Sequence, residues 1–207
     1  MNVMNIKDPP MRTFWTRQVV QVEEELRNSG VYRPKESYIR KKNGEIADFY
    51  LRLYRWFTRE ASKYIVPTGD YPIWLSISDE HMLQPTDGTV ILELEIPADA
   101  YLLCNYDAWG YIVNYFYVPT DEEDRRRHEA DLARYGIGSD DELFLTAKGN
   151  FYPLLKREVM TSWSRVFTLP PRDLLYGLVS TAWEIRSEWV KEIRHYGDVD
   201  SSDAGGI

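Results

Sequence analysis

The stretch Thr89–Pro97 alternates strictly between apolar and partly polar residues, and this pattern constrains the fold more than any other. Val90 and Leu92 fall on one face, whereas Glu93 and Glu95 fall on the other. A period of two residues predicts a β-strand with one buried face. The chain must therefore build a sheet and cover one side of it.

Two helical patterns precede this strand. Residues 19–30 place apolar residues at helical spacing, and Gly30 supplies a C-terminal stop. Residues 46–64 form a longer apolar stripe with charges opposite, which predicts an amphipathic helix. Helices come first and strands later without regular alternation. The pattern therefore favours an α+β fold with a compact mixed or antiparallel sheet over a doubly wound parallel sheet.

The remaining elements follow from shorter patterns. We expect strands at 13–18 and 71–78, a loop at 31–44, a helix at 107–116, a charged peripheral helix at 120–135 with a capping box from Thr120 to Glu123, two short strands within 151–169, and a long C-terminal helix from Pro171 to about Gly197. The length favours one domain over residues 1–197, followed by a flexible tail at 198–207.

Composition excludes several classes of protein. The 25 basic and 33 acidic residues give a net charge of -8, which argues against a broad duplex-DNA surface. Cys104 is the single cysteine, so we expect no disulfide and a small buried hydrophobe at that position. No apolar run approaches the roughly 20 residues of a membrane helix, and no signal peptide is evident. We therefore expect a cytoplasmic protein with no membrane partner.

No phosphate loop, dinucleotide fingerprint, nucleophile elbow or HExxH motif occurs. Three polar insertions into apolar strands remain as candidates for chemistry. They are Thr16-Arg17-Gln18 on the first strand, Tyr71 with Trp74 and Ser76 on the middle strand, and Glu158 within the stretch 154–160.

This order resembles the ADP-ribosyltransferase superfamily of the bacterial toxin and defence type. Such domains have a polar residue on an early strand, a helix ending in Gly, a Tyr- or Ser-bearing second strand and a glutamate on a late strand. Several stretches also resemble an uncharacterised bacterial domain family of unknown function: Trp15-Thr16-Arg17-Gln18, Tyr71-Pro72-Ile73-Trp74, residues 92–97, Asp107-Ala108-Trp109 and Ser162-Trp163.

The superfamily resemblance implies a NAD-dependent ADP-ribosyltransferase with NAD as co-substrate. Thr16 or Arg17 would anchor a ribose or a phosphate of NAD, and Gln18 would support that contact from the same strand. Tyr71 or Trp74 would stack on nicotinamide, while Ser76 would brace the glutamate. The catalytic residue would be Glu158, which would stabilise the oxocarbenium-like cation.

The resemblance leaves the acceptor open. No His stands in the first motif, and no acidic or amide residue precedes Glu158 by two positions, which disfavours arginine modification. A nucleic acid or another macromolecule is therefore the expected acceptor, and an antitoxin-like protein could restrain the activity.

Other interpretations compete with this one. Glu93 and Glu95 share a strand face and could form an acid/base pair, although a solvent-facing edge is the simpler explanation. The run 79–81 could hold a metal, but no partner His lies nearby. His128 and His195 sit among charges and are expected on the surface. With 7 Trp and 15 Tyr, the chain could also be a non-enzymatic interaction module with an aromatic-rich surface.

Overall fold

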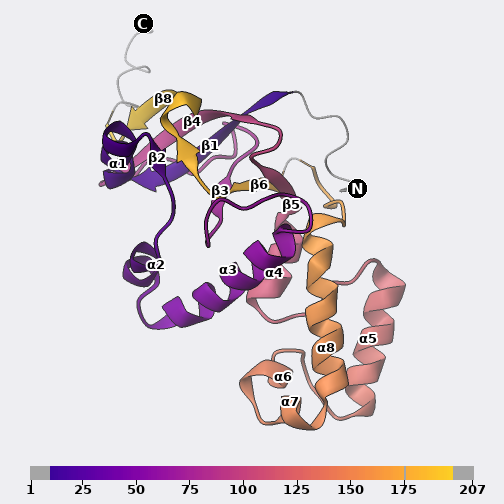
Figure 1. Ribbon diagram of the computed structural model, residues 1–207. Helices are drawn as coiled ribbons and strands as arrows, with labels where there is room; N and C mark the ends of the chain where they lie inside the picture. Colours follow the sequence, from indigo (N-terminus) through magenta and orange to yellow (C-terminus); the bar gives the residue numbers. More distant parts are fainter. Residues whose placement is uncertain (1–9, 175, 198–207) are drawn as a thin grey trace, which may run out of the picture. The chain divides into compact units, whose positions relative to one another are not determined.

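The computed structural model describes residues 10–174 and 176–197 (Figure 1). The described chain divides into two compact units, where one domain over 1–197 was expected. The first unit holds residues 10–103 and 179–197, and the second holds residues 104–178. The predicted flexible tail at 198–207 lies outside the described residues.

Among the described residues, the first unit has three α-helices, and each of the strands lies wholly or partly in it. The strands are β1 (Met11–Val19), β2 (Val31–Tyr32), β3 (Ile73–Leu75), β4 (Thr89–Pro97), β5 (Leu102–Asn105), β6 (Leu178–Ala182), β7 (Ile185–Arg186) and β8 (Val190–His195). The helices are α1 (Gln21–Ser29), α2 (Glu36–Asn43) and α3 (Ala47–Ala61), with short 3-10 turns at Gly44–Ile46 and Ser187–Trp189. The chain leaves this unit through β5 and returns through β6.

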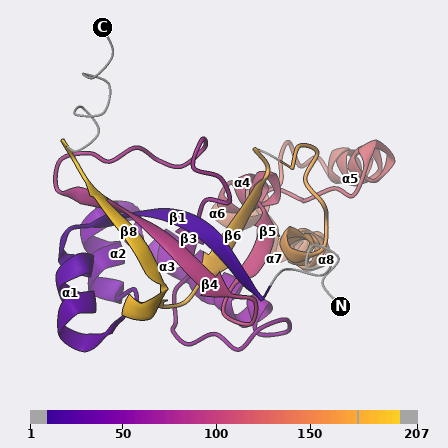
Figure 2. The ribbon, with the colours of Figure 1, turned by 90° about the horizontal axis from the view of Figure 1, so that it is seen from above.

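Small antiparallel sheets organise these strands. β4 lies between β1 and β8 (Figure 2), and β6 lies between β3 and β5. β2 pairs with β7. An isolated antiparallel bridge from Trp15 to Ser76 joins β1 to the residue directly after β3. The α+β class is therefore confirmed, and β4 has the bounds and the buried apolar face that its alternation predicts.

Aromatic side chains hold α3 onto the strands. The Phe57 ring lies 5.4 Å from the Trp74 ring and 6.3 Å from the Trp183 ring, measured between centroids. Trp183 Nε1 also donates a 2.8 Å hydrogen bond to Thr58 Oγ1. Phe57 and Trp183 are buried and Trp74 is partly buried, and this packing contributes several kcal/mol because it removes a large apolar area from water. The predicted helical stripe at 46–64 is therefore the core-facing side of α3.

The second unit is helical. Its elements are α4 (Tyr106–Val113), α5 (Glu122–Arg134), α6 (Glu142–Leu145), α7 (Lys148–Phe151), α8 (Pro153–Ser162) and a 3-10 turn at Trp163–Phe167. The rings of Tyr115, Phe144 and Trp163 stack on one another, with Tyr115 and Phe144 only 4° from parallel. Within the described residues, none of the helices has the length and apolar character needed to span a membrane.

Three predicted elements are wrong. Residues 151–169 form helix rather than strands, because Pro153 starts α8 and buried Leu155 and Val159 recur at a helical spacing of four. The loop predicted at 31–44 contains α2, whose first turn is stabilised by an ion pair from Glu36 to Arg40. The long C-terminal helix is instead β6, β7 and β8, since those residues pair with distant strands that local spacing cannot reveal.

The charged helix predicted at 120–135 does form as α5, but it begins one residue later than the capping box suggests. Asp121 is the N-cap, and its side chain accepts a hydrogen bond from Asp124 N. The Asp124 carboxylate in turn accepts from Thr120 N at 3.0 Å. The helix also buries His128 and Leu132, so it belongs to the core of the second unit rather than to its periphery.

Candidate functional site

The two strands predicted to contact NAD lie side by side in the first unit. Thr16 is buried, and its Oγ1 donates to the Trp74 carbonyl at 3.0 Å. Gln18 Nε2 donates to Thr16 Oγ1 at 2.8 Å, the supporting contact expected from their shared strand face. Trp15 and Ser76 exchange two backbone hydrogen bonds. The structure thus brings Thr16, Gln18, Trp74 and Ser76 together.

Arg17 and Ser76 make contacts that the sequence does not predict. Arg17 is the neighbour of Thr16, so its side chain points to the opposite strand face. Its Nη1 donates to the Gln84 carbonyl at 3.0 Å. The Ser76 hydroxyl donates to the Ser78 carbonyl at 2.8 Å rather than to a glutamate. Both side chains therefore bind the backbone that follows β3.

The Tyr71 ring is less available for stacking than the sequence implies. Tyr71 is buried, its hydroxyl donates to Glu36 and accepts from Arg55, and the Arg55 guanidinium lies 5.9 Å from the ring centroid. Burial raises the pKa of Tyr71 more than the Arg55 hydrogen bond lowers it. Trp74 is partly exposed and contacts Phe57. Of the two rings, Trp74 has the accessible surface.

Glu158 does not lie on a strand, and this part of the prediction is wrong. It belongs to α8 in the second unit, whereas the other six predicted residues belong to the first. Its Oε1 accepts a 2.8 Å hydrogen bond from Arg127 Nη2 and lies 3.7 Å from His128 Nδ1. The seven predicted residues therefore do not form a site within one compact unit.

A buried pair formed by His128 and Asp140 lies beside Glu158. His128 Nε2 is 2.6 Å from Asp140 Oδ1, and the other Asp140 oxygen accepts from Tyr117 N at 2.9 Å. Because a carboxylate only accepts, Nε2 carries the hydrogen. The Tyr117 ring stacks on the imidazole at 4.0 Å, and buried His128 Nδ1 has no hydrogen-bond partner. The expectation of a surface histidine is wrong, although the four-residue spacing to apolar Leu132 could have indicated a buried face.

The Asp124 carboxylate accepts hydrogen bonds from several side chains. It accepts from the Tyr117 hydroxyl at 2.9 Å, from Arg127 Nη2 at 3.0 Å and from Arg165 Nη1 at 2.9 Å. Burial raises the pKa of Asp124, but these hydrogen bonds and the one from Thr120 N outweigh that effect. The pKa of Asp124 therefore lies well below its usual range, and the carboxylate stays charged.

Glu184 is a buried acidic residue of the first unit that the sequence analysis does not single out. It follows β6 by two residues, and the last β6 residue, Ala182, pairs with Ile73 at the start of β3. Arg186 Nε donates to Glu184 Oε1 at 2.7 Å, and Arg33 Nη2 binds Oε2. Burial raises the pKa of this carboxyl, but the two arginines together lower it by more, so the pKa lies below its usual value. Glu184 lines a pocket of about 370 Å³ together with Trp183 and Trp189.

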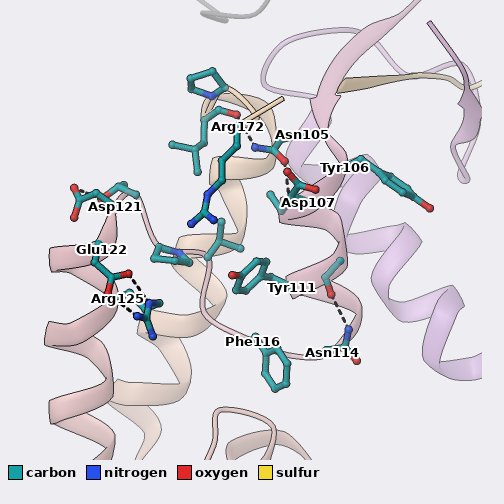
Figure 3. Close-up of a pocket in the computed structure, with 17 residues that line it drawn as sticks. Asn105, Tyr106, Asp107, Tyr111, Asn114, Phe116, Asp121, Glu122, Arg125 and Arg172 are labelled. Carbon is teal, nitrogen blue, oxygen red and sulfur yellow. Dashed lines mark hydrogen bonds and ion pairs between the residues drawn. The ribbon is translucent and has the colours of Figure 1, made fainter. Parts of the chain in front are cut away.

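A larger pocket, of about 820 Å³, lies entirely within the second unit (Figure 3). Arg172 and Tyr111 point into it, while Tyr106 turns away. Arg125 at its edge is paired with Glu122. The wall also includes the apolar residues Ala108, Val118, Pro119, Leu169 and Pro170.

The alternative sites lose support. Glu93 pairs with Arg194 at 2.9 Å and Glu95 pairs with Lys191, so each carboxylate has its own cation from β8. Within residues 10–174 and 176–197, no group of three His, Cys, Asp or Glu side chains could hold a metal ion. Cys104 is buried, as predicted, and burial raises the pKa of its thiol. A buried protonated thiol is a poor nucleophile.

Comparison with known proteins gives the family. The model of a domain of unknown function, DUF3841, matches residues 13–191, so the chain belongs to this family. The resemblance to an uncharacterised domain family is thereby confirmed. No curated protein and no solved structure is significantly similar to the chain.

Proposed function

We propose that this protein is a NAD-consuming ADP-ribosyltransferase that acts in the cytoplasm as a toxin or phage-defence effector. The observation that carries the proposal is the bridge from Trp15 to Ser76, which pairs β1 with the segment after β3. The two strands predicted to contact NAD, β1 with Thr16 and β3 with Trp74, are therefore neighbours. Between them in the chain lies α1, which ends at Gly30 in the left-handed conformation. This order of elements is the one on which the resemblance rests.

Thr16, Gln18 and Arg17 supply the ribose and phosphate contacts in this proposal. The hydrogen bonds from Gln18 to Thr16 and from Thr16 to the Trp74 carbonyl hold the hydroxyl in one orientation. Arg17 binds one backbone carbonyl, which leaves most of its five donors for a phosphate. Trp74, with the more accessible ring, is the proposed stacking surface for nicotinamide.

The carboxylate role is better filled by Glu184 than by Glu158. Glu184 belongs to the same unit as β1 and β3 and leaves the sheet at the end where β3 begins. Its two arginine partners keep it ionised. Stabilising a positive transition state requires a fixed negative charge, and an ionised, held carboxylate provides one. The neighbouring pocket of about 370 Å³ lies within the size range of small-molecule sites.

The reaction is a displacement at C1′ of the nicotinamide ribose. The bond from C1′ to the nicotinamide nitrogen breaks, and its electron pair leaves with neutral nicotinamide. A nucleophile of the acceptor forms a new bond to C1′ and loses its proton to solvent or to a base. Glu184 would stabilise the positive charge that develops on the ribose between these events.

The test uses the whole protein with NAD labelled on the adenosine side. It is incubated with protein, RNA and DNA acceptors in turn, and both nicotinamide release and transfer of label are measured. Release coupled to label on one acceptor class supports the proposal. Absence of release with every acceptor, at micromolar enzyme and over hours, would contradict it. Toxicity on expression, relieved by a restraining protein, would support the effector role.

A second candidate function is a protein-interaction module. Leu145, Phe151 and Leu154, at the α6 to α8 end of the second unit, are between 67% and 76% exposed. Exposed apolar side chains that lie close along the chain are typical of contact surfaces. An inactive protein whose binding to a partner is lost with Phe151→Ser and Leu154→Ser would favour this function over catalysis.

A further inference from the structure

The large pocket of the second unit contains charged groups without partners. Arg172 and Asp107 line this pocket of about 820 Å³, and neither makes a hydrogen bond or an ion pair with any residue that the structure describes. The Tyr111 hydroxyl also has no hydrogen-bond partner there. Elsewhere in this unit, Asp124 and Glu158 are paired, whereas the exposed Glu123, Arg134 and Arg157 have no partner among the described residues and do not line this pocket. Unpaired groups that share one pocket indicate a ligand rather than a structural role.

The shape and polarity of the wall favour a flat ring. Tyr111 projects into the hollow and is 37% exposed, so part of its ring is accessible (Figure 3). Val118, Pro119 and Leu169 give apolar surface at the same pocket. An aromatic ring with apolar neighbours stacks on any nucleobase, a contact worth ~1–3 kcal/mol per base.

Among the described residues of this pocket wall, Arg172 is the only cation without an ion-pair partner. The other arginine of the wall, Arg125, is bound by Glu122 at 2.6 Å and by Glu129 at 2.5 Å. Figure 3 shows the Arg172 guanidinium inside the hollow, on the side facing Arg125. A free guanidinium matches a phosphate group in charge and in the geometry of its paired donors.

Asp107 selects among phosphate-bearing ligands. An unpaired carboxylate repels a second anionic group and accepts from N–H or O–H donors. The exocyclic amino groups of nucleobases and the ribose hydroxyls are such donors. A stacking ring, one free cation and one free acceptor together match a nucleotide better than a simple anion, a lipid tail or a sugar.

We infer that this pocket binds a nucleotide, with its base on Tyr111, its phosphate on Arg172 and a base amino group or ribose hydroxyl on Asp107. The inference names the substrate class of the proposed transferase and, as a functional statement, rests on that proposal. The nucleotide could belong to NAD or to a nucleic-acid strand. Binding is measured without turnover, so the pocket can be tested separately from the chemistry.

The test measures equilibrium binding to the full-length protein by calorimetry. The probes are NAD, the four ribonucleoside monophosphates, single-stranded RNA and DNA hexamers, and inorganic phosphate. We expect micromolar to submillimolar binding of at least one nucleotide probe, with phosphate alone at least tenfold weaker. Preference for a hexamer assigns the pocket to the acceptor, whereas preference for NAD would place the co-substrate here and contradict the NAD contacts proposed for Thr16, Arg17 and Trp74.

Variants test the assigned contacts. Arg172→Ala should weaken nucleotide binding by about 10- to 100-fold, because a charge-assisted hydrogen bond is lost. Tyr111→Ala should weaken binding by about tenfold or more, and Asp107→Asn should change the order of preference among the bases or the ribose contacts. Arg126→Ala is the matched control, because Arg126 is exposed on α5, pairs with Glu122 and lies outside the pocket wall.

Two results would overturn the inference. One is no binding of any nucleotide probe at millimolar concentration by a folded protein. The other is equal weakening by Arg126→Ala and Arg172→Ala, which would indicate general charge attraction. Binding that depends on Arg172 without any nicotinamide release keeps the pocket and removes the proposed function. Unchanged nicotinamide release without nucleotide binding at this pocket would support the proposed function and contradict the inference about the pocket.

Discussion

The predicted motif residues of the first unit differ from the pocket residues of the second unit in their hydrogen bonding. In the first unit the predicted motif residues bind one another or nearby backbone, as Thr16, Gln18 and Ser76 do. In the second unit, Asp124 has several donors, whereas Arg172 and Asp107 of the large pocket have no hydrogen-bond or ion-pair partner among the described residues. We infer that the paired side chains stabilise the fold, whereas the unpaired side chains of the pocket bind a ligand. Paired groups should change stability when mutated, and unpaired groups should change binding.

The largest expected effect on stability comes from the buried pair of the second unit. Asp140→Ala leaves His128 Nε2 and Tyr117 N without their acceptor. Each buried donor left without an acceptor costs about 1–3 kcal/mol of unfolding free energy. Denaturant unfolding with hydrogen exchange should place this loss within residues 104–178. A loss below 1 kcal/mol, or one spread evenly over both units, would break the comparison.

Acid should affect the second unit through Asp124. Its pKa is lower in the folded protein than in the unfolded chain, so its stabilisation is complete above the unfolded value near ~4. That stabilisation is lost as the pH falls through the folded pKa, with a total on the order of 2 kcal/mol. Unfolding free energies measured from pH 7 to pH 2.5 should fall less steeply in Asp124→Asn. Parallel pH curves for the two proteins would contradict the assignment.

A smaller effect is expected from the paired residues of the first unit. Thr16→Val removes the hydrogen bond to the Trp74 carbonyl and the acceptor of Gln18, which costs about 1 kcal/mol. Arg17→Ala, the control next to it on the opposite strand face, should change stability by less than ~0.5 kcal/mol. Thermal unfolding of both variants checks this, and a reversed order would show that Thr16 is not held as described.

The smallest expected effect concerns Cys104, whose thiol should not be alkylated in the folded protein. Cys104 lies where the chain passes from the first unit to the second, it is buried, and burial raises the pKa of its thiol. Iodoacetamide at pH 8 should therefore leave the folded protein unmodified and label it only after denaturation. Fast labelling of the native protein would show that the chain opens at this point.

Sequence patterns predict the local part of this architecture. The alternation of Thr89–Pro97 and the stripe of 46–64 specify β4 and α3, because each buries one face along its whole length. Glu158 is misplaced because its apolar neighbours suit both strand and helix, and the spacing from Leu155 to Val159 decides the matter. Strands β6 to β8 are missed because their partners lie far away in the chain.

The candidate site divides in the same way. Neighbouring motif residues such as Thr16 and Gln18 are found because strand geometry places them on one face. Glu184 is missed because its ion pair with Arg33 joins residues that lie far apart in the chain. The pocket around Arg172 is missed because an exposed arginine in a loop has no local signature. Only the absence of partners in the folded protein identifies it.

The most direct measurement compares nicotinamide release by Glu184→Gln and Glu158→Gln with release by the wild-type protein. The account predicts a ~10²–10³-fold loss for Glu184→Gln, because the charge that stabilises the cation is removed. Release by Glu158→Gln should stay within about twofold of the wild-type rate, since Glu158 accepts a hydrogen bond from Arg127 in the second unit. Melting temperatures of both variants, and Glu184→Asp as the variant that keeps the charge, control for folding. Full release by a folded Glu184→Gln protein, or loss with Glu158→Gln alone, would contradict the account.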